Sequence, residues 1–461
     1  MANNTLKKIF LYFLISHLLI WALVPSLVNN NLPRDTIEAL AWGSNLEWGF
    51  EKHPPLSAFA TEVFYKVFGS QDWAYYFLSQ LFVVSAFFIV WIFSGEFFKN
   101  QIYPLISLLL LEGIYFYNFT TPEFNVNVCQ LPFWALSVLY AWRGFRDNKN
   151  SDWLLFGLFA GLGILSKYLF IYLLVTMDVF FCYMIIKKKI NFKALISLIP
   201  FFLVLLPHLI WLTENNYVTV TYGLHRSVSD FYAGNSGLLN HIKYPLIFLA
   251  KQVGILIPFF ILFLFITSKL KTKLNFKDKK LIFLLSINIL PLFFIFLTSL
   301  FFGINIRTMW MTPFYLFFGV LVVYIFEKNI NLKKIKNFYI AFLFLFILSP
   351  CLYFFNSTVK KDQRIDYPAQ DISSKVQENW NKNFKNDINI VIGQAWWAGN
   401  LSYHLESRPK YIRGYLGFVK EKLSSRDGVV YIEHESSKLT KSCPGVSFVV
   451  HSLYICMVGT T

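Results

Sequence analysis

Charged and histidine side chains that could do chemistry gather in residues 29–72, directly after the first long apolar run. Asp35 follows Arg34, and a second group stands just before two consecutive prolines: Glu51, Lys52 and His53. Carboxylates can act as general bases or orient a substrate, and neighbouring cations can bind an anion. The structural alternatives are that Asp35 caps a helix and that the second group is a solvated turn fixed by the prolines.

Asp35 also belongs to a helical pattern. Asp35, Glu38 and Trp42 are spaced at i, i+3 and i+7, which places them on one face of a helix. This spacing predicts an amphipathic helix that lies on the membrane surface.

A second acid lies in the turn at residues 120–127. Glu123 and Asn125 follow Pro122 at the mouth of an apolar helix, with Asn127 two residues further on. Acids and amides near the hydrocarbon region are costly to place there and are therefore commonly functional. The alternative is that they cap the helix that begins at this point.

Basic residues are scarce near these acids, which makes each one a candidate for binding phosphate. Lys167 interrupts the apolar stretch 153–186, where it either snorkels to the interface or binds an anionic group. The other candidates are His225, Arg226 and Arg307.

Apolar helices must position these residues, because 56% of the 461 residues are hydrophobic and only 15% are charged. Soluble domains contain roughly 25% charged residues, so the composition indicates an α-helical polytopic membrane protein. About eleven runs approach the length of roughly 20 residues that a span needs. They lie near 9–28, 73–94, 103–119, 124–142, 153–166, 169–186, 193–212, 245–266, 281–301, 308–326 and 337–355.

Two features of these runs concern individual spans. The stretch 153–186 is either one bent helix or two short ones. The run 9–28 follows Lys7 and Lys8 and precedes no small-residue cleavage site, so we expect it to remain as an uncleaved first span.

Basic residues alternate between the connecting segments, and the run 187–189 is the densest example. The positive-inside rule places the basic connectors in the cytoplasm and the loops 29–72, 120–127 and 213–244 on the opposite face. This alternation accounts for much of the net charge of +16 without a nucleic-acid partner. We therefore expect a multi-pass membrane protein whose candidate site faces away from the cytoplasm.

The sequence becomes charged and polar at about residue 356. Short apolar runs at 388–392, 429–432 and 446–450 predict strands, and 395–406 predicts a helix. We therefore expect residues 1–355 to form a transmembrane domain and residues 356–461 to form a small α/β domain on the outer face. Cys443 and Cys456 in this tail could form a disulfide if the domain is exported.

Several of these motifs resemble the C-type glycosyltransferases of the protein O-mannosyltransferase superfamily, and in particular the bacterial lipid A aminoarabinose transferases. Asp35 and the turn FEKHPPL at 50–56 resemble that family's acid and F-E-K-P-P-L-like turn, except that His53 is inserted before the prolines. Glu123 fits the second acid, where many relatives have Asp. The remaining similar segments are GLGILSKY, the run around Trp310 and Pro313, and AWWAGNLSYHLESRP in the tail.

The resemblance implies an enzyme that moves one sugar, an amino sugar among the candidates, from a polyprenyl-phosphate carrier to an outer-leaflet acceptor, most of all lipid A. Cations must then neutralise the leaving phosphate, and Lys52, Arg226 and Arg307 are the candidates. Asp35 would be the general base for a hydroxyl acceptor, or would orient a phosphate acceptor or a sugar amine. Glu123 would bind the sugar or stabilise positive charge at its anomeric carbon. The other expected substrate-binding residues are Arg34, Glu51, His53, Asn125, Lys167 and His225.

Three alternatives stay open at this point. The acceptor could be a protein, as in other branches of the superfamily, or another glycan. The chain could instead be a lipid or glycan transporter, although no internal repeat supports this. An O-antigen polymerase or ligase would carry its long loop late in the chain rather than after the first span. No motif requires a metal or another cofactor, while the acids and histidines leave a divalent ion open.

Overall fold

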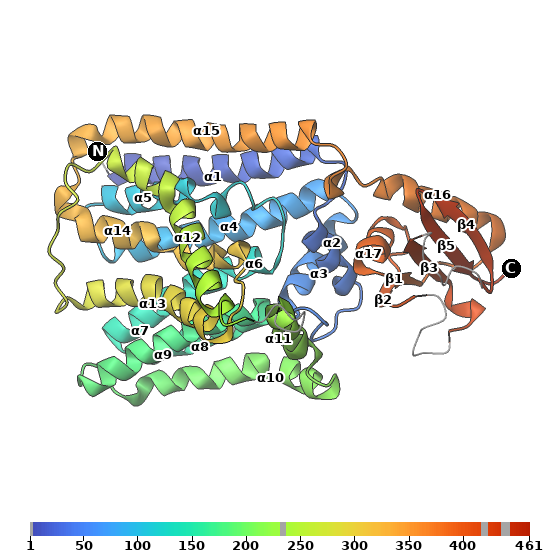
Figure 1. Ribbon diagram of the computed structural model, residues 1–461, viewed down its shortest axis with the longest axis horizontal. Coiled ribbons are helices and arrows are strands. Elements are labelled where there is room, and N and C mark those ends of the chain that lie inside the picture. Colours follow the sequence, from blue (N-terminus) through green and yellow to red (C-terminus); the bar gives the residue numbers. More distant parts are fainter. Residues whose placement is uncertain (1–2, 231–236, 416–422, 435–442) are drawn as a thin grey trace.

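The computed structural model describes residues 3–230, 237–415, 423–434 and 443–461. A bundle of roughly parallel helices forms most of the molecule, and a small sheet domain lies at one end of it (Figure 1). The long helices are α1 (Asn3–Val28), α4 (Asp72–Gly95), α9 (Ile171–Ile186), α10 (Leu198–Glu214), α12 (Asn240–Leu264), α13 (Lys279–Phe302) and α15 (Ile335–Val359). The α-helical membrane fold with a small C-terminal α/β domain is confirmed.

Seven helices of the described chain are long and apolar enough to cross a membrane, and an eighth counts if the bent pair η6 (Thr308–Tyr315) and α14 (Phe318–Phe326) is one span. The other predicted runs also contain helices, but these are shorter: α5 (Ile102–Leu109) with η1 (Leu110–Gly113), α7 (Leu131–Asp147) and α8 (Asn150–Ser166). The stretch 153–186 is resolved as two helices, α8 and α9, with η3 (Tyr168–Phe170) between them.

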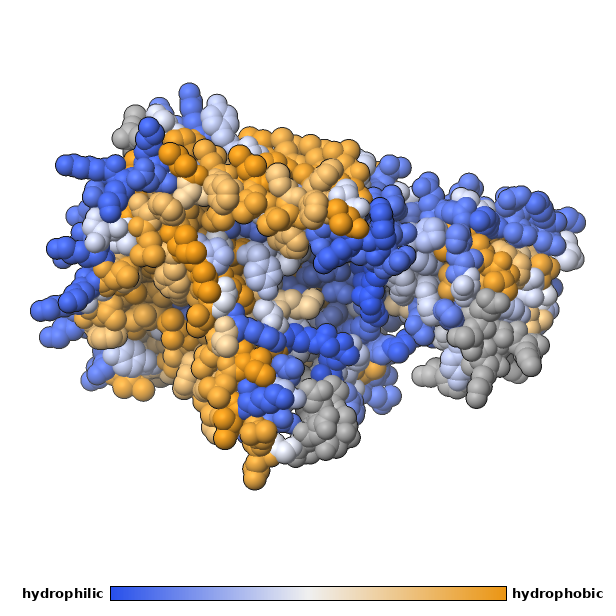
Figure 2. Space-filling model, turned by 45° about the horizontal axis from the view of Figure 1, so that its top comes forward, coloured by the Kyte–Doolittle hydropathy of each residue, from blue (hydrophilic) through white to orange (hydrophobic). Residues whose placement is uncertain are grey.

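The surface of the bundle is suited to lipid. Figure 2 shows a broad hydrophobic belt over the helices, with hydrophilic residues at both ends. Leu23, Ile199 and Phe344 are examples of large apolar side chains that are more than half exposed on this belt. Lipid tails can solvate such side chains, whereas water would penalise a patch of this size.

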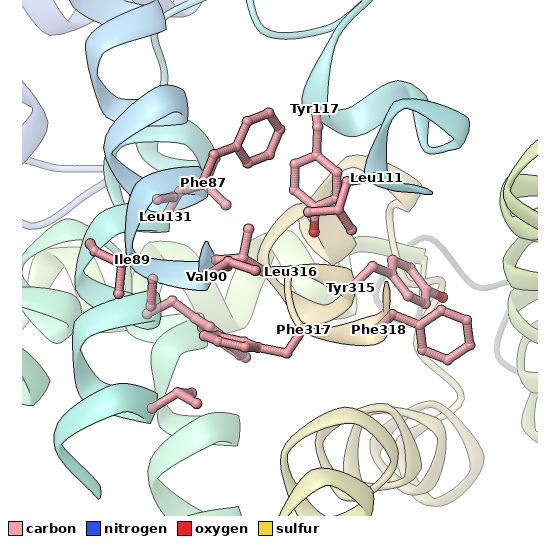
Figure 3. Close-up of a cluster of buried hydrophobic side chains, with 14 of the residues drawn as sticks. Phe87, Ile89, Val90, Leu111, Tyr117, Leu131, Tyr315, Leu316, Phe317 and Phe318 are labelled. Atoms are coloured by element: carbon pink, nitrogen blue, oxygen red, sulfur yellow. The ribbon is translucent and has the colours of Figure 1, made fainter. Parts of the chain in front are cut away.

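Aromatic and aliphatic side chains fill the interior of the bundle. Figure 3 shows Phe87 and Val90 of α4 facing Tyr117 of η2 (Tyr115–Tyr117) and Phe317, which precedes α14. The Tyr117 hydroxyl donates to Thr312 O at 2.7 Å, so its polar end is satisfied inside the apolar core. The core thus joins segments that are more than 200 residues apart in the sequence.

A glycine allows α14 to approach α5 closely. A Cβ atom at Gly319 would lie 2.0 Å from the carbonyl oxygen of Ser107. Small residues at such contacts let membrane helices pack backbone against backbone.

Short helices at the end of the bundle carry the segments that the sequence singled out. These helices are α2 (Arg34–Gly43), α3 (Leu56–Phe68), α6 (Val126–Cys129) and α11 (Val218–Asp230). In Figure 1, α2 and α3 lie between the long helices and the sheet domain.

The C-terminal domain is a five-stranded mixed sheet in the order β2-β1-β3-β5-β4. Its elements are α16 (Ala369–Asn383), β1 (Ile390–Gly393), α17 (Ala395–His404), β2 (Lys410–Arg413), β3 (Val429–His434), β4 (Val446–Val450) and β5 (Leu453–Val458). Strands β2, β1 and β3 are parallel, while β5 pairs antiparallel with β3 and β4. Cys443 and Cys456 are joined by a disulfide.

The predicted strands and helix of this domain are present, while α16, β2 and β5 were not predicted. The expected boundary at residue 355 falls inside α15, which continues to Val359. The domain is also less separate than its composition indicates, because Trp42 and Phe50 from the first loop share an apolar core with Val391 and Ile432 of the sheet.

Arg408 is the main polar link between the domain and the bundle. Its guanidinium donates to Glu62 Oε2 at 2.8 Å and to Leu40 O at 2.7 Å, and it lies 4.1 Å from the centre of the Tyr65 ring. The Arg408 and Glu62 side chains are both mostly buried. Removing one partner of a buried ion pair leaves the other charge uncompensated.

We expect Arg408→Met to destabilise the attachment of the domain by about 3 kcal/mol, because Glu62 loses its buried partner. The thermal unfolding midpoint of the purified protein in detergent should fall, and proteolysis between α15 and α16 should accelerate. Lys382→Met is the matched control, since Lys382 pairs with Glu378 on the exposed surface of α16. Equal midpoints for the two variants would contradict this account.

Candidate active site

Helix α2 is present where the sequence predicts it, but it does not lie on the membrane surface. Residues 36–43 are all buried, because one side of the helix packs on the bundle and another on α17. Gly399 of α17 approaches Ile37 and Ala41 so closely that a Cβ atom would lie 3.0 Å from each. The prediction of a surface helix is therefore wrong, because the C-terminal domain covers it.

Asp35 and Glu123 come together although they are 88 residues apart. Asp35 lies in the first turn of α2, and its backbone N–H donates to Glu123 Oε1 at 3.0 Å. Thr36 next to it donates to Phe124 O at 3.1 Å. The N-cap residue of α2 is Pro33, so Asp35 lies inside the first turn and is not the cap. The arrangement therefore places two carboxyl groups beside each other at a helix N-terminus.

Burial and a neighbouring negative charge act on each of the two carboxyl groups. Burial raises the pKa of Asp35, and the nearby charge of Glu38 raises it further. Burial likewise raises the pKa of Glu123, with a further contribution from Asp35. Two carboxylates in one poorly solvated place disfavour double ionisation. The pair is therefore prepared to share a proton or to receive a cationic or proton-donating group.

Asn125 caps a helix, which is the alternative role that the sequence allows for this turn. Its Oδ1 accepts hydrogen bonds from the backbone N–H groups of Asn127 and Val128 at 2.9 and 3.2 Å, which caps α6. The cap fixes the turn that carries Glu123.

Lys167 is buried next to this cap and does not snorkel into water. Its ammonium group donates to Asn127 Oδ1 at 2.5 Å and lies 5.5 Å from the centre of the Trp310 ring, with 8% of the residue exposed. Burial lowers the pKa of Lys167 to about 7, while the charge of Asp35 acts in the opposite direction. Lys167 lies at the backbone break between α8 and α9, and this break places its amino group near Asp35.

Arg34 and Lys52 are both bound to Glu38. Lys52 Nζ donates to Glu38 Oε1 at 2.8 Å, and Arg34 Nε donates to the same oxygen at 3.1 Å. Lys52 is therefore near the acids, but its charge is already partly neutralised. Glu38 lies on the same helical face as Asp35, as the spacing predicts.

His53 and Glu51 contribute to the shape of the first loop. His53 packs edge-on against Trp42 with ring centroids 5.9 Å apart, and burial lowers its pKa to about 3, so the ring is neutral. Glu51 forms an ion pair with Arg413 of β2. The loop is also held from α11, where Thr219 donates to Phe50 O at 2.5 Å.

A cavity of about 550 Å³ is lined by Glu123, whereas Asp35 is not among its lining residues and reaches it only through its contact with Glu123. Figure 2 shows hydrophilic surface recessed between the hydrophobic helices near the C-terminal domain. Glu123, Asn125 and Asn127 line the cavity from the turn before α6 and from α6 itself, and Lys251 and Arg307 line it from α12 and the start of η6. The cavity therefore joins acidic and amide groups with two cations.

The structure brings together some of the predicted phosphate ligands but not all of them. Arg307 lines the cavity, whereas His225 and Arg226 lie on the exposed side of α11 and are not among its lining residues. Lys251 was not predicted as a site residue. A lysine in the middle of the apolar helix α12 is an unusual feature that could have identified it.

No three histidine, cysteine, aspartate or glutamate side chains among the described residues form a group that could hold a metal ion.

Part of the chain matches a family of known transferases. Residues 52–211 match the dolichyl-phosphate-mannose-protein mannosyltransferase family. This segment begins inside the FEKHPPL turn and includes Glu123 and Lys167. A comparison with curated protein sequences finds no significant match.

The whole chain shares its fold with a solved bacterial structure. ArnT from Cupriavidus metallidurans bound to undecaprenyl phosphate matches with a TM-score of 0.64 and 12% sequence identity, over 99% of this chain and 98% of that chain. The apo state of ArnT matches with a TM-score of 0.62 and 12% identity over the same shares. At this identity the match shows the fold. Together with the family match, it supports the superfamily that the sequence motifs indicate.

The raised pKa of Glu123 predicts a pH-dependent stability change. The folded protein retains the Glu123 proton at pH values where the unfolded chain has lost it, so this carboxyl destabilises the fold as pH rises from 5 towards 9. Glu123→Gln keeps the acceptor for the Asp35 N–H without the charge. We expect its thermal midpoint to exceed that of the wild type by more at pH 9 than at pH 5.

The measurement is thermal unfolding in detergent at both pH values. Glu378→Gln is the control, because Glu378 is exposed on α16 and its pKa is lowered by Lys382, so this variant should gain no stability at high pH. If the thermal midpoints of Glu123→Gln and the wild type differ by the same amount at pH 5 and pH 9, the raised pKa of Glu123 is refuted.

Proposed function

We propose that this chain is a glycosyltransferase that takes one monosaccharide from a polyprenyl-phosphate carrier and transfers it to an acceptor in the outer leaflet. The observation that carries this proposal is the carboxyl pair Asp35–Glu123 beside a cavity that also contains Lys251 and Arg307. The mannosyltransferase match over residues 52–211 supports the reaction type. The undecaprenyl phosphate bound to ArnT, which has the same fold, supports the class of carrier.

The proposed reaction is a single displacement at the anomeric carbon. An acceptor oxygen forms a bond to this carbon while the bond to the carrier phosphate oxygen breaks, and the electron pair of that bond leaves with the lipid phosphate. The leaving group gains negative charge, so cations held in a cavity with little water lower the barrier. Lys251 and Arg307 are suited to this role, because neither forms an ion pair with a described residue.

Asp35 would act on the acceptor. Its raised pKa makes it a stronger base than an ordinary aspartate, which suits the removal of a proton from an attacking hydroxyl. If the acceptor is a phosphate, no proton needs to be removed, and Asp35 would orient it through the cations nearby. Glu123 would then bind an amino or hydroxyl group of the sugar or stabilise positive charge at the anomeric carbon.

Lys167 would balance the charge of the two acids. It is held by Asn127 and Trp310, so it can maintain Asp35 in the ionised form without moving. Lys52 would also balance negative charge near the acids, because it is bound to Glu38. It would therefore not serve as a phosphate ligand alone. Arg226, which the sequence suggested as a phosphate ligand, has no support from the cavity geometry.

Lipid A is the acceptor that we propose first, since the loop and tail motifs resemble the aminoarabinose transferases and the chain has the ArnT fold. The sugar is then one of the small set that such carriers deliver, with an amino sugar as one candidate. A protein acceptor is the second candidate, because the matching family is described as protein mannosyltransferases. In either case the site would face the periplasm from the inner membrane.

Lipid A from a deletion strain complemented with wild type, Asp35→Asn or an empty vector should test this function. We expect mass spectrometry to show a hexose-, hexosamine- or aminopentose-sized increment with the wild type, and its loss with the other two. Asp371→Asn is the matched control, because Asp371 lies on the exposed surface of α16 and should retain the increment. Identical lipid A in all strains would contradict this acceptor and would direct the search to glycoproteins.

Binding of undecaprenyl phosphate should separate the cavity cations from the other basic residues. A charge-assisted hydrogen bond to phosphate contributes about 1.5–3 kcal/mol, so Lys251→Met and Arg307→Met should each weaken binding by about tenfold or more. Arg226→Met should bind like the wild type, because Arg226 lies outside the cavity lining. Native mass spectrometry can measure undecaprenyl phosphate binding by all three variants. If only Arg226→Met loses binding, the phosphate binds outside this cavity.

A further inference from the structure

A groove of about 380 Å³ lies between α1 and α15. The two helices run side by side in the same direction, and both begin at the end of the bundle that is farther from the C-terminal domain (Figure 1). The groove is separate from the candidate active-site cavity, because the two share no lining residue. Its occupant must therefore be inferred from its own residues.

One wall of the groove is a stripe of α1. Ile9, Tyr12, Phe13 and Ser16 line it at i, i+3, i+4 and i+7, which is the spacing of one helical face. Tyr12 is 67% exposed, so the groove opens towards lipid rather than into the bundle. Ser16 is the smallest of the four residues, and it leaves space that a larger side chain would fill.

The other wall has the same spacing on α15, where Tyr339, Phe342, Leu343 and Phe346 line the groove. Phe342 and Phe346 are buried, and their ring centroids lie 5.8 and 5.9 Å from that of Phe13. These three rings form an aromatic floor, while Leu343 is half exposed at the edge. Hydrocarbon packed on such a floor gains from burial and from dispersion.

The size of the groove favours an acyl chain over a protein helix. The groove extends from Ile9 to Ser16, which is about 10 Å along the axis of α1. A helix with its side chains is about 10–12 Å across, so the same length of helix would need roughly twice the volume of the groove or more. An acyl chain is thinner and flexible, so it can fill this space.

Two lysines continue the stripes beyond the groove. Lys8 lies four residues before Tyr12, and Lys336 lies three residues before Tyr339, so each is one turn nearer to its helix start on about the same face. Both lysines are exposed, and neither forms an ion pair with a described residue. Helical side chains lean towards the helix start, so these ammonium groups can reach the level of the lipid headgroups while their stems stay beside the groove.

Further lysines make this end of the bundle strongly basic. Lys7 precedes Lys8, and Lys333 and Lys334 come just before α15. Figure 2 shows hydrophilic side chains projecting from this end of the molecule. Lysine clusters beside a space between membrane helices are typical of sites for anionic lipid headgroups. The charge of the rim therefore complements an anion, and the groove complements its hydrocarbon chain.

We propose that this groove binds an anionic phospholipid, with one acyl chain on the aromatic floor and the phosphate between Lys8 and Lys336. A zwitterionic headgroup also contains a phosphate, but its own cation competes with the two lysines, so net negative charge decides the preference. The lipid would join the helix that leads to α2 to the helix that leads to the C-terminal domain. The proposal does not depend on glycosyl transfer, so its failure would leave the proposed function untouched.

The test uses the full-length protein in detergent after removal of native lipid, with binding measured by native mass spectrometry. The probes are phosphatidylglycerol, phosphatidylethanolamine and phosphatidylcholine with identical chains. We expect phosphatidylglycerol to bind about tenfold more tightly than the other two, since each lysine near the headgroup contributes about fivefold. Phosphatidylglycerol with a diazirine in its acyl chain should cross-link to the peptides of α1 and α15 that line the groove.

The double substitution Lys8→Gln and Lys336→Gln should abolish the preference for phosphatidylglycerol. The matched control is Lys187→Gln with Lys189→Gln, which also removes two charges but from the connector after α9, on the other side of the bundle (Figure 1). This control should keep the preference of the wild type.

Ser16→Phe fills the groove without changing a charge, so it should weaken binding of all three lipids. Leu23→Phe is its matched control, because Leu23 is exposed on the same helix but does not line the groove. The control should bind lipid like the wild type.

Equal binding of the three lipids by the wild type would overturn the proposal, and so would a preference that survives the loss of both lysines. Cross-links confined to other helices would overturn it as well, and this map needs no substitution, so it decides even if Ser16→Phe does not fold. A dimer that Ser16→Phe disrupts and that added lipid leaves intact would assign the groove to a second copy of the chain instead.

Discussion

The contact between the first turn of α2 and the turn before α6 is the constraint on which the site depends. Asp35 N–H donates to Glu123 Oε1, and Thr36 donates to Phe124 O, so the two segments are fixed at two adjacent points. This contact holds two carboxyl groups where little water reaches them. Electrostatic interactions are stronger there than at the surface, so the position of each neighbouring cation changes the protonation of the pair.

The C-terminal domain is part of this arrangement rather than an appendage. It covers α2 with α17, and Arg408 reaches Glu62 and Leu40 on the bundle. Tyr403 of α17 also donates to Asp72 at 2.8 Å, at the first residue of α4. A site formed on short loops alone would be loosely held, and packing against a folded domain supplies the rigidity that preorganisation requires.

The sequence was sufficient to find the acids but not all of their partners. Asp35 and Glu123 are conspicuous because charges are rare in an apolar chain, and the i, i+3, i+7 spacing correctly predicted a helix at α2. Its burial could not be predicted, because the covering helix lies about 360 residues later. Arg226 was a candidate because basic residues are scarce near the acids, whereas Lys251, inside an apolar helix, was not predicted as a site residue. Strand β2 was missed because its four residues carry little periodicity, and β5 was missed although it is as long as β3.

Two basic side chains without an ion-pair partner among the described residues lie where the candidate active-site cavity meets a second cavity, between η1, α12 and α15. Lys251 lines both, and neither Lys251 nor Arg307 forms an ion pair with a described residue, while Asp35 and Glu123 have raised pKa values. A fold selected for stability alone would pair these groups or replace them with apolar residues. Their retention is explained if a substrate supplies the missing charges, phosphate for the cations and a proton-donating group for the acids. Conflicts between local stability and charge are expected at functional sites, and here they coincide with the space that a lipid-linked phosphate could occupy.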